Sequence, residues 1–166
     1  MMTRSRRGFV LVYSYVSMST SEDWSVPLLL YFDASILYAE DNATPRSAAV
    51  GYVFENGSAT LYTGSIPIDA FISSAHLEYR ALVEATRKLA ERTESPRSLH
   101  IHGDADDVIQ TVDPSQPATS GDRITRRRVD RIRRYTEGIP VVTYRSIERG
   151  HNTHAHEAAR AGHRSD

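Results

Sequence analysis

The chain has 166 residues, of which 40% are hydrophobic and 25% are charged. This composition is typical of one soluble globular domain, and it excludes both a disordered chain and two ordinary domains. The formal net charge is −1 at pH 7, so only a local basic patch could attract nucleic acid. Cysteine is absent, which excludes disulfides, thiolate zinc sites and cysteine nucleophiles.

Residues 1–22 differ from the rest of the chain. A basic start precedes a short apolar run at 8–16, which faintly resembles a secretory signal. Tyrosine and serine interrupt the run and no A-x-A-like cleavage site follows, so we interpret 1–22 as a disordered tail or an overlong start, with Met18 as the natural beginning. Residues 23–166 then form one domain. No apolar segment has the length of a transmembrane helix, and we expect a monomeric cytoplasmic protein without membrane contact.

Residues 26–35 contain five consecutive large apolar or aromatic residues that run into Asp33. Such a short run predicts a strand that is buried on both faces. An unpaired carboxylate at the end of this strand would be costly unless something cationic balances it. Asp33 is therefore either a metal ligand or paired acid, or a residue that caps or turns the chain at the strand end.

The next segment predicts a polar loop followed by a hairpin. Residues 47–68 alternate between apolar and polar positions around Asn56-Gly57, the strongest short hairpin signal. Gly51 allows a close approach of the backbone to Asp33 or to a ligand. The three strands of the resulting antiparallel meander are expected at 27–34, 47–55 and 58–66.

Helices and strands alternate in the second half of the chain. Residues 73–92 form the clearest helix, with serines that can cap its start and a stripe of apolar residues every fourth position. The order βββαβααβα predicts an α/β fold with a mixed sheet of five strands and helices on its faces. The later elements are expected at 98–104 (strand), 104–112 and 124–138 (helices), 139–147 (strand) and 152–162 (helix).

The helix at 124–138 is rich in arginine. Ile124, Ile132 and Tyr135 lie loosely on one side, and seven arginines surround the rest. This pattern is compatible with a solvated, partly salt-bridged helix and equally with a surface that follows phosphates.

Three acids are expected at one edge of the sheet. Asp33 and Asp104 each follow an apolar strand, and the ends of neighbouring parallel strands meet where ligand sites form in α/β folds. Glu78 lies near the start of the long helix, one residue after the apolar Leu77, and can face the same edge. Three converging carboxylates repel one another unless a cation binds between them. Because their oxygen ligands are hard, the favoured cations are Mg²⁺ and Mn²⁺.

The closing helix is dense in histidine. His156 lies beside Ala155, Ala158 and Ala159, which allow this turn to approach the sheet closely, so His156 is a candidate fourth ligand. His154 is interpreted as a solvated side chain.

The motifs YFDAS, AHLEYRALVEA, HGDADDVI and NTHAHEAAR, in this order, resemble type 1 ribonuclease H in its compact archaeal and bacterial form. The resemblance covers residues 26–162 and implies the ribonuclease H-like fold. It places the four metal-binding positions of the family on Asp33, Glu78, Asp104 and His156, where histidine replaces the usual aspartate.

The resemblance implies hydrolysis of the RNA strand of an RNA–DNA hybrid by two divalent ions, Mg²⁺ or Mn²⁺. Asp33 would bridge both ions, Glu78 and Asp104 would hold the ion nearer the leaving group, and His156 would help hold the other. Recognition would use 2′-hydroxyls and phosphates rather than base edges. The residues expected to touch substrate are Ser35, Ser74, His151 and Asn152.

Several departures from the family pattern leave alternatives open. Ser74 and Ala75 replace asparagines that often touch the hybrid, Asp106 replaces a common Gln or Lys, and the basic handle of some members is absent. A non-catalytic nucleic-acid-binding module on the same fold is therefore a second hypothesis. A 3′→5′ exonuclease is a third, weakened because Ser35 occupies the place of that group's second acid.

Overall fold

The structure is a computed structural model, and it describes residues 27–57, 59–69, 73–117 and 121–163. The residues of the expected N-terminal tail, 1–22, lie outside this part. The elements are β1 (Leu28–Tyr38), β2 (Pro45–Glu55), β3 (Thr60–Ile68), α1 (Ser74–Ala90), β4 (Ser98–Gly103), α2 (Asp106–Val112), α3 (Arg123–Thr136), β5 (Val141–Ser146), a 3-10 turn η1 (Arg149–His151) and α4 (Thr153–Ala161). The predicted order of strands and helices is confirmed.

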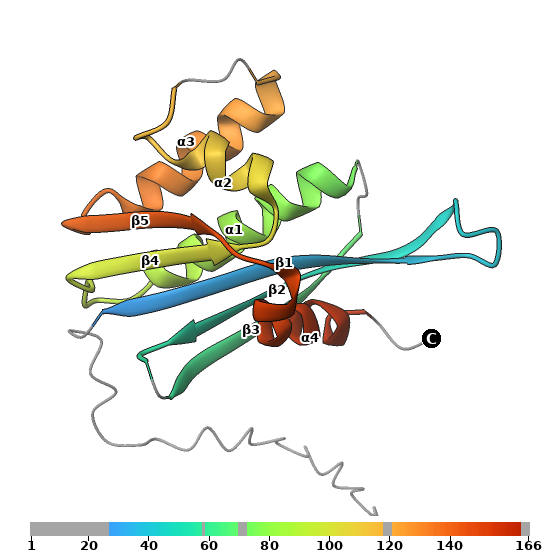
Figure 1. Ribbon diagram of the computed structural model, residues 1–166, viewed down its shortest axis with the longest axis horizontal. Coiled ribbons are helices and arrows are strands. Elements are labelled where there is room, and N and C mark those ends of the chain that lie inside the picture. Colours follow the sequence, from blue (N-terminus) through green and yellow to red (C-terminus); the bar gives the residue numbers. More distant parts are fainter. Residues whose placement is uncertain (1–26, 58, 70–72, 118–120, 164–166) are drawn as a thin grey trace, which may run out of the picture.

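The strands form one sheet in the order β3-β2-β1-β4-β5 (Figure 1). The first three strands pair antiparallel and β1, β4 and β5 pair parallel, which confirms the predicted mixed sheet. Gly57 has a φ of 96°, a conformation that glycine adopts without strain, in the turn between β2 and β3. The hairpin signal at Asn56-Gly57 is therefore confirmed.

The hairpin of β1 and β2 is longer than predicted. The segment after Asp33 was expected to be a polar loop, but β1 continues to Tyr38 and β2 begins at Pro45. The Asp41 side chain accepts hydrogen bonds from the backbone N–H groups of Ala43 and Thr44, at 2.9 and 2.8 Å. This tight turn closes the chain within a few residues, so the ladder extends into the segment that looked like a loop.

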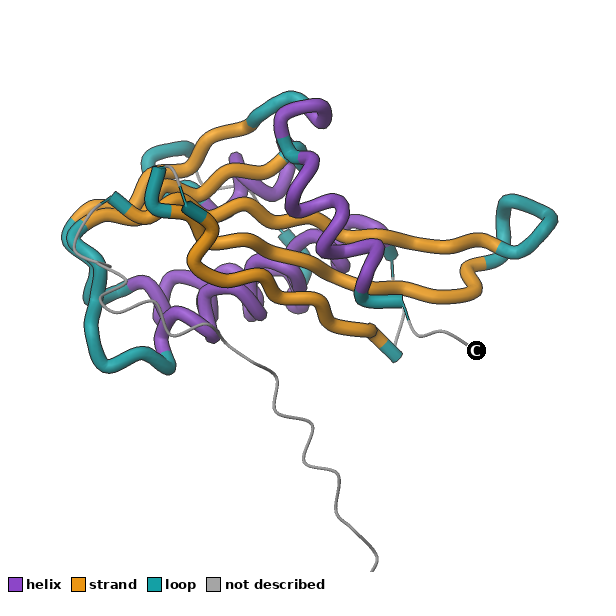
Figure 2. Tube along the Cα trace, turned by 90° about the horizontal axis from the view of Figure 1, so that it is seen from below, coloured by secondary structure: helices purple, strands orange, loops and turns teal. Residues whose placement is uncertain are grey.

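Helices α1 and α4 cover opposite faces of the sheet (Figures 1 and 2). Tyr52 of β2 stacks on Tyr62, over whose ring Lys88 of α1 lies, which marks the α1 face. A Cβ atom on the preceding residue, Gly51, would point to the other face and lie 2.1 Å from the backbone nitrogen of Ala159 in α4. Gly51 lies opposite Asp33 in the β1–β2 pairing, so the expected close approach to Asp33 is present. The space left by the missing side chain, however, is filled by α4 and not by a ligand.

Large apolar side chains between the sheet and α1 form the core. Leu28, Leu30 and Phe32 alternate along β1 and are fully buried. Helix α1 is capped by Ser73, whose hydroxyl accepts a hydrogen bond from His76 N–H at 3.3 Å. Among the described residues, no helix is long and apolar enough to cross a membrane.

Helix α3 packs through part of the predicted set: Ile132 is buried and Tyr135 is partly buried against the core, as expected. Val129, Ile132 and Thr136 are its buried side chains. Ile124, expected on the apolar side, is 42% exposed.

Candidate metal centre

Asp33 and Asp104 meet where the parallel pairing of β1 and β4 ends. The last paired residues are Tyr31 and His102, two positions before each acid. Strand β4 then stops at Gly103 and Asp104 follows, whereas β1 continues, so Asp33 lies within its strand and not at the predicted end. Asp33 and Asp104 are nevertheless neighbours as predicted, because each lies two residues after the last pair of the β1–β4 ladder.

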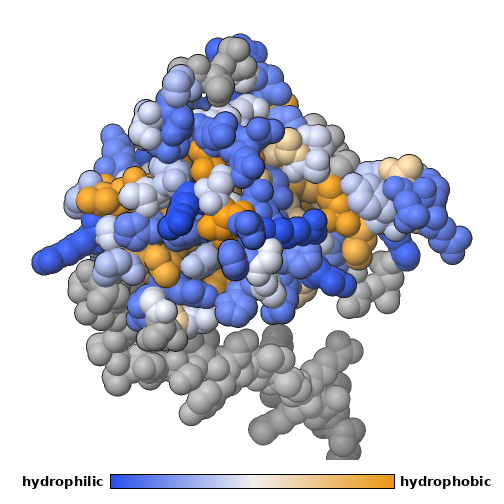
Figure 3. Space-filling model, viewed as in Figure 1, coloured by the Kyte–Doolittle hydropathy of each residue, from blue (hydrophilic) through white to orange (hydrophobic). Residues whose placement is uncertain are grey.

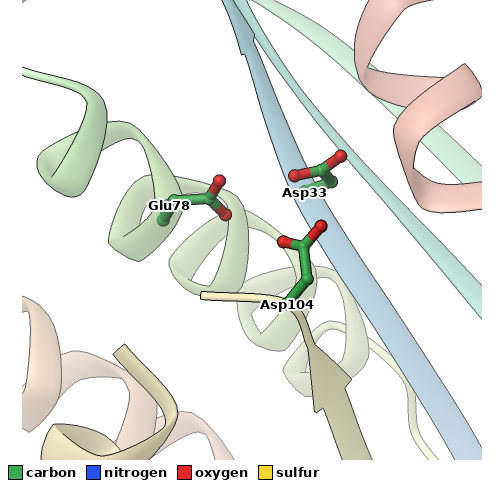
Figure 4. A group of neighbouring side chains, drawn as sticks. All are labelled: Asp33, Glu78 and Asp104. Carbon is green, nitrogen blue, oxygen red and sulfur yellow. The ribbon is translucent and has the colours of Figure 1, made fainter. Parts of the chain in front are cut away.

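Glu78 reaches the two aspartates from the second turn of α1. Figure 4 shows the three carboxylates directed toward one another from β1, α1 and the end of β4. One potential ligand oxygen from each lies within 4.8 Å of the other two. The predicted grouping of Asp33, Glu78 and Asp104 is thus present in the structure.

Mutual repulsion and burial perturb this group strongly. Burial, followed by the charges of Asp33 and Asp104, raises the pKa of Glu78 to about 9. Burial and the charge of Asp33 also raise the pKa of Asp104, while Arg149 and His156 act in the opposite direction. Without a cation, burial and the neighbouring charges therefore favour the protonated form of Glu78.

The carboxylates open into a solvent-accessible hollow of about 650 Å³. The connection from β5 to η1 forms one wall of this hollow and contributes Ser146, Ile147, Glu148 and Arg149. Arg149 thus adds a positive charge to a predominantly acidic site.

His156 contacts Asp33 directly. Its Nδ1 atom lies 2.9 Å from Oδ2 of Asp33, and its side chain is 30% exposed. The other oxygen of Asp33 accepts a hydrogen bond from the N–H of Ala34 at 2.9 Å. Within the described residues, the second ring nitrogen of His156, Nε2, makes no hydrogen bond. His156 thus contacts one of the three acids, but it is not part of the group whose ligand atoms lie within 4.8 Å of one another.

Two predicted substrate contacts lie in the interior. Ser35 is 9% exposed and its hydroxyl lies 2.9 Å from Nε2 of His163, whose Nδ1 contacts Ser47. Asn152 is 1% exposed and donates from Nδ2 to the carbonyl oxygen of Phe32 at 2.9 Å. Ser35 and Asn152 therefore join the sheet to the two ends of α4, and neither side chain lies on the surface.

The other two predicted contacts are exposed. Ser74 is the first residue of α1, one turn before Glu78, on the same side of the helix. His151 is exposed in η1 and lines two hollows beside Tyr31. It does not line the acidic hollow, where Arg149 of the same turn forms part of the wall.

Two contributors were not predicted from the sequence. Arg149 directly precedes the Gly150-His151 pair, and only the path of the chain from β5 to α4 brings its side chain to the acids. His163 follows the last turn of α4, seven residues after His156, so the two histidines share one side of this helix. The spacing of seven residues could have predicted that both histidines face the sheet. They contact Asp33 and Ser35, which lie two residues apart on β1.

The residues present fit a hard divalent cation. The three acids supply only oxygen ligands, which Mg²⁺ and Mn²⁺ prefer. Oε2 of Glu78 is buried and has no hydrogen-bond partner within the described residues, although it lies among negative charges. A bound cation would offset the repulsion between the carboxylates and would give Oε2 of Glu78 a partner.

No protein-family model and no curated protein matches the sequence. Solved structures do match over most of the chain. Ribonuclease H1 of the halophilic archaeon Halobacterium salinarum is 23% identical, with a TM-score of 0.68 over 82% of this chain and 96% of that one. The N-terminal ribonuclease H domain of a Mycobacterium tuberculosis protein is 16% identical, with a TM-score of 0.69 over 83% and 94%. LC11 ribonuclease H1, in complex with an RNA/DNA hybrid, is 17% identical, with a TM-score of 0.65 over 81% and 94%. The chain therefore has the ribonuclease H fold, as its sequence motifs predicted.

Proposed function

We propose that this protein is a metal-dependent endonuclease that hydrolyses the RNA strand of RNA–DNA hybrids with two divalent ions. The observation that carries the proposal is the convergence of Asp33, Glu78 and Asp104 on one open hollow of a ribonuclease H fold. The raised pKa of Glu78 supports it, because strongly perturbed acids in a cleft are candidates for a functional site.

The carboxylates and His156 have distinct proposed roles. Asp33 would hold both ions, Glu78 and Asp104 would hold one of them, and His156 would offer Nε2 to the other. When bound, two such ions activate a water and stabilise the attacking and leaving oxygens of a phosphodiester. Nδ1 of His156 orients one oxygen of Asp33, and the Ala34 N–H orients the other.

Substrate recognition is proposed to depend on phosphates and 2′-hydroxyls. Arg149 lines the acidic hollow and can pair with a phosphate oxygen next to the carboxylates. The exposed hydroxyl of Ser74 lies one helical turn before Glu78 and can contact a 2′-hydroxyl. LC11 ribonuclease H1, which shares the fold, forms a complex with an RNA/DNA hybrid.

A cleavage assay on three duplexes tests the proposal. The purified chain is incubated with labelled RNA–DNA hybrid, double-stranded RNA and double-stranded DNA, each with Mg²⁺, Mn²⁺ or EDTA. We expect cleavage of the RNA strand of the hybrid with one or both metals, and none in EDTA. An intact hybrid under all conditions, with a control ribonuclease H active in the same buffers, would refute the proposal.

A non-catalytic hybrid-binding module is the second candidate function. One observation favours it. The fourth ligand position holds His156 in place of the usual aspartate of the family pattern, and Nδ1 of this histidine already contacts Asp33. Metal-dependent binding of the hybrid without cleavage would support this candidate over the endonuclease.

A further inference from the structure

The seven arginines of α3 divide into two groups. Arg128 donates from Nη1 to the carbonyl oxygen of His76, and Arg133 donates to that of Val112 at 3.2 Å, so these two fix neighbouring helices. The other five arginines are exposed, and their side chains make no ion pair or hydrogen bond among the described residues. Arg123, Arg126, Arg127, Arg131 and Arg134 form this second group.

Four of these exposed arginines share one face of the helix. At 3.6 residues per turn, they lie within roughly 80° of the helix circumference. This face is opposite the buried side chains Val129, Ile132 and Thr136. The arginine stripe, defined as Arg123, Arg127, Arg131 and Arg134, spans about 16 Å along the helix axis.

The stripe concentrates charge on a protein that is otherwise acidic. Seven arginines and Asp130 give α3 a formal charge of +6, whereas the whole chain has −1, so the remainder carries −7. Asp130 makes no ion pair with the stripe within the described part of the chain. The surface around α2 and α3, at the top of Figure 3, is largely hydrophilic. Like charges at this spacing repel one another, so the stripe costs stability unless an anion neutralises it.

Helix α3 begins close to the candidate metal centre. The bond from Arg128 to His76 joins its first half to the first turn of α1, two residues before Glu78. His76 Nε2 also lies 3.7 Å from the carboxylate of Asp122, the N-cap of α3. A duplex longer than the acidic hollow must pass over neighbouring surface, and α3 is joined to α1 within two residues of Glu78.

We propose that the arginine stripe binds the phosphate backbone of the RNA–DNA hybrid outside the cleavage site. A duplex presents a phosphate about every 3.4 Å of axis on each strand, so a stripe of 16 Å can meet several phosphates. The guanidinium fork suits each of these contacts. The choice of the hybrid as ligand rests on the proposed function, but binding by the stripe requires neither metal nor cleavage.

Binding of a fluorescent hybrid in EDTA tests the stripe separately from catalysis. Anisotropy titrations over a range of salt concentrations give the affinity and its salt dependence for the full chain. Arg127→Gln/Arg131→Gln removes two charges from the stripe. Arg97→Gln/Arg160→Gln is the matched control, because both residues are exposed and lie outside α3. Arg127→Lys/Arg131→Lys keeps the charge, and thermal melts show that each variant folds.

We expect the stripe variant to bind about tenfold more weakly near 0.1 M salt, with a log–log salt slope reduced by about 2. The control and lysine variants should retain most of the affinity. An equal loss in the control variant, or unchanged affinity and slope in the stripe variant, would overturn the inference. Unchanged hybrid binding with stripe-dependent binding to phosphatidylserine vesicles would overturn it in favour of a membrane surface. Stripe-dependent binding without cleavage under any metal would support the inference while refuting the proposed function.

Discussion

The Nδ1 atom of His156 lies 2.9 Å from Oδ2 of Asp33 and joins α4 to the middle of β1. Asp33 is nearly buried and His156 is partly exposed, so the imidazole links an interior carboxylate to the open side of the site. A histidine in this place can orient Asp33, and its Nε2 has no hydrogen bond among the described residues.

Replacement of His156 by alanine tests this link. His156→Ala should lower metal affinity or hybrid cleavage about 10–100-fold, as is usual when a group that orients metal ligands is lost. Cleavage is measured across a titration of Mg²⁺ and of Mn²⁺. The control is His154→Ala, because His154 is 68% exposed and contacts Glu55 instead. Equal metal dependence of the wild type and His156→Ala would count against both roles of His156.

Glu78 should make the metal-free protein sensitive to pH. Its pKa is about 9 in the folded protein against 4.5 ordinarily, so the folded state binds an extra proton between these values. Stability from this group is therefore lost as the pH rises from about 4.5 to 9, by at most about 1.4 kcal/mol per pH unit.

Urea unfolding in EDTA at several pH values measures this effect. Glu78→Gln, which does not titrate, should lose less stability than the wild type as the pH rises. Glu157→Gln, at an exposed position on α4, should follow the wild type. Parallel pH profiles for the wild type and Glu78→Gln would show that Glu78 is not perturbed.

Gly51 should be intolerant of a side chain. A Cβ there would lie 2.1 Å from the backbone nitrogen of Ala159, so Gly51→Ala must push α4 away from the sheet. We expect a loss of about 1–3 kcal/mol in the free energy of unfolding, typical of overpacking, and a loss of cleavage because His156 moves with α4. Gly138→Ala is the control, since the nearest atom there is 4.0 Å away. Similar stability of the two variants would contradict this packing.

Asn152 should affect the site through the backbone of β1. Asn152→Ala removes the hydrogen bond to the carbonyl oxygen of Phe32, the residue before Asp33, at a cost of about 1–3 kcal/mol. Chemical denaturation and cleavage rates are compared with those of Thr153→Ala, an exposed neighbour. If Asn152→Ala cleaves hybrid at the wild-type rate and unfolds at the same denaturant concentration, the bond has no positioning role.

The sequence predicted the sheet and three of the acids because local signals agree with the fold. The apolar run before Asp33, the Asn56-Gly57 turn and the apolar stripe of α1 each favour one element, and their order leaves few topologies. The length of β1 was missed because its extension depends on the Asp41 turn, whose hydrogen bonds are not visible in an apolar pattern.

Contacts between distant segments were harder to predict. Gly51 is small because α4 packs on it, and Asn152 and Ser35 are buried because α4 and its end lie on β1. Each of these pairs is more than 100 residues apart in the chain. Residue type alone therefore suggested a surface role for polar groups that the tertiary structure places in the interior.

The most direct measurement compares the wild type with Asp104→Asn on a labelled RNA–DNA hybrid, both purified in parallel. Asp104→Asn removes one carboxylate of the cluster and keeps its shape, so a contaminating nuclease would show as equal activity in both samples. We expect the wild type to cut the RNA strand with Mg²⁺ or Mn²⁺ and to stop in EDTA, and Asp104→Asn to leave the hybrid intact. Absence of cleavage by the wild type, or equal cleavage by both proteins, would contradict the proposed function.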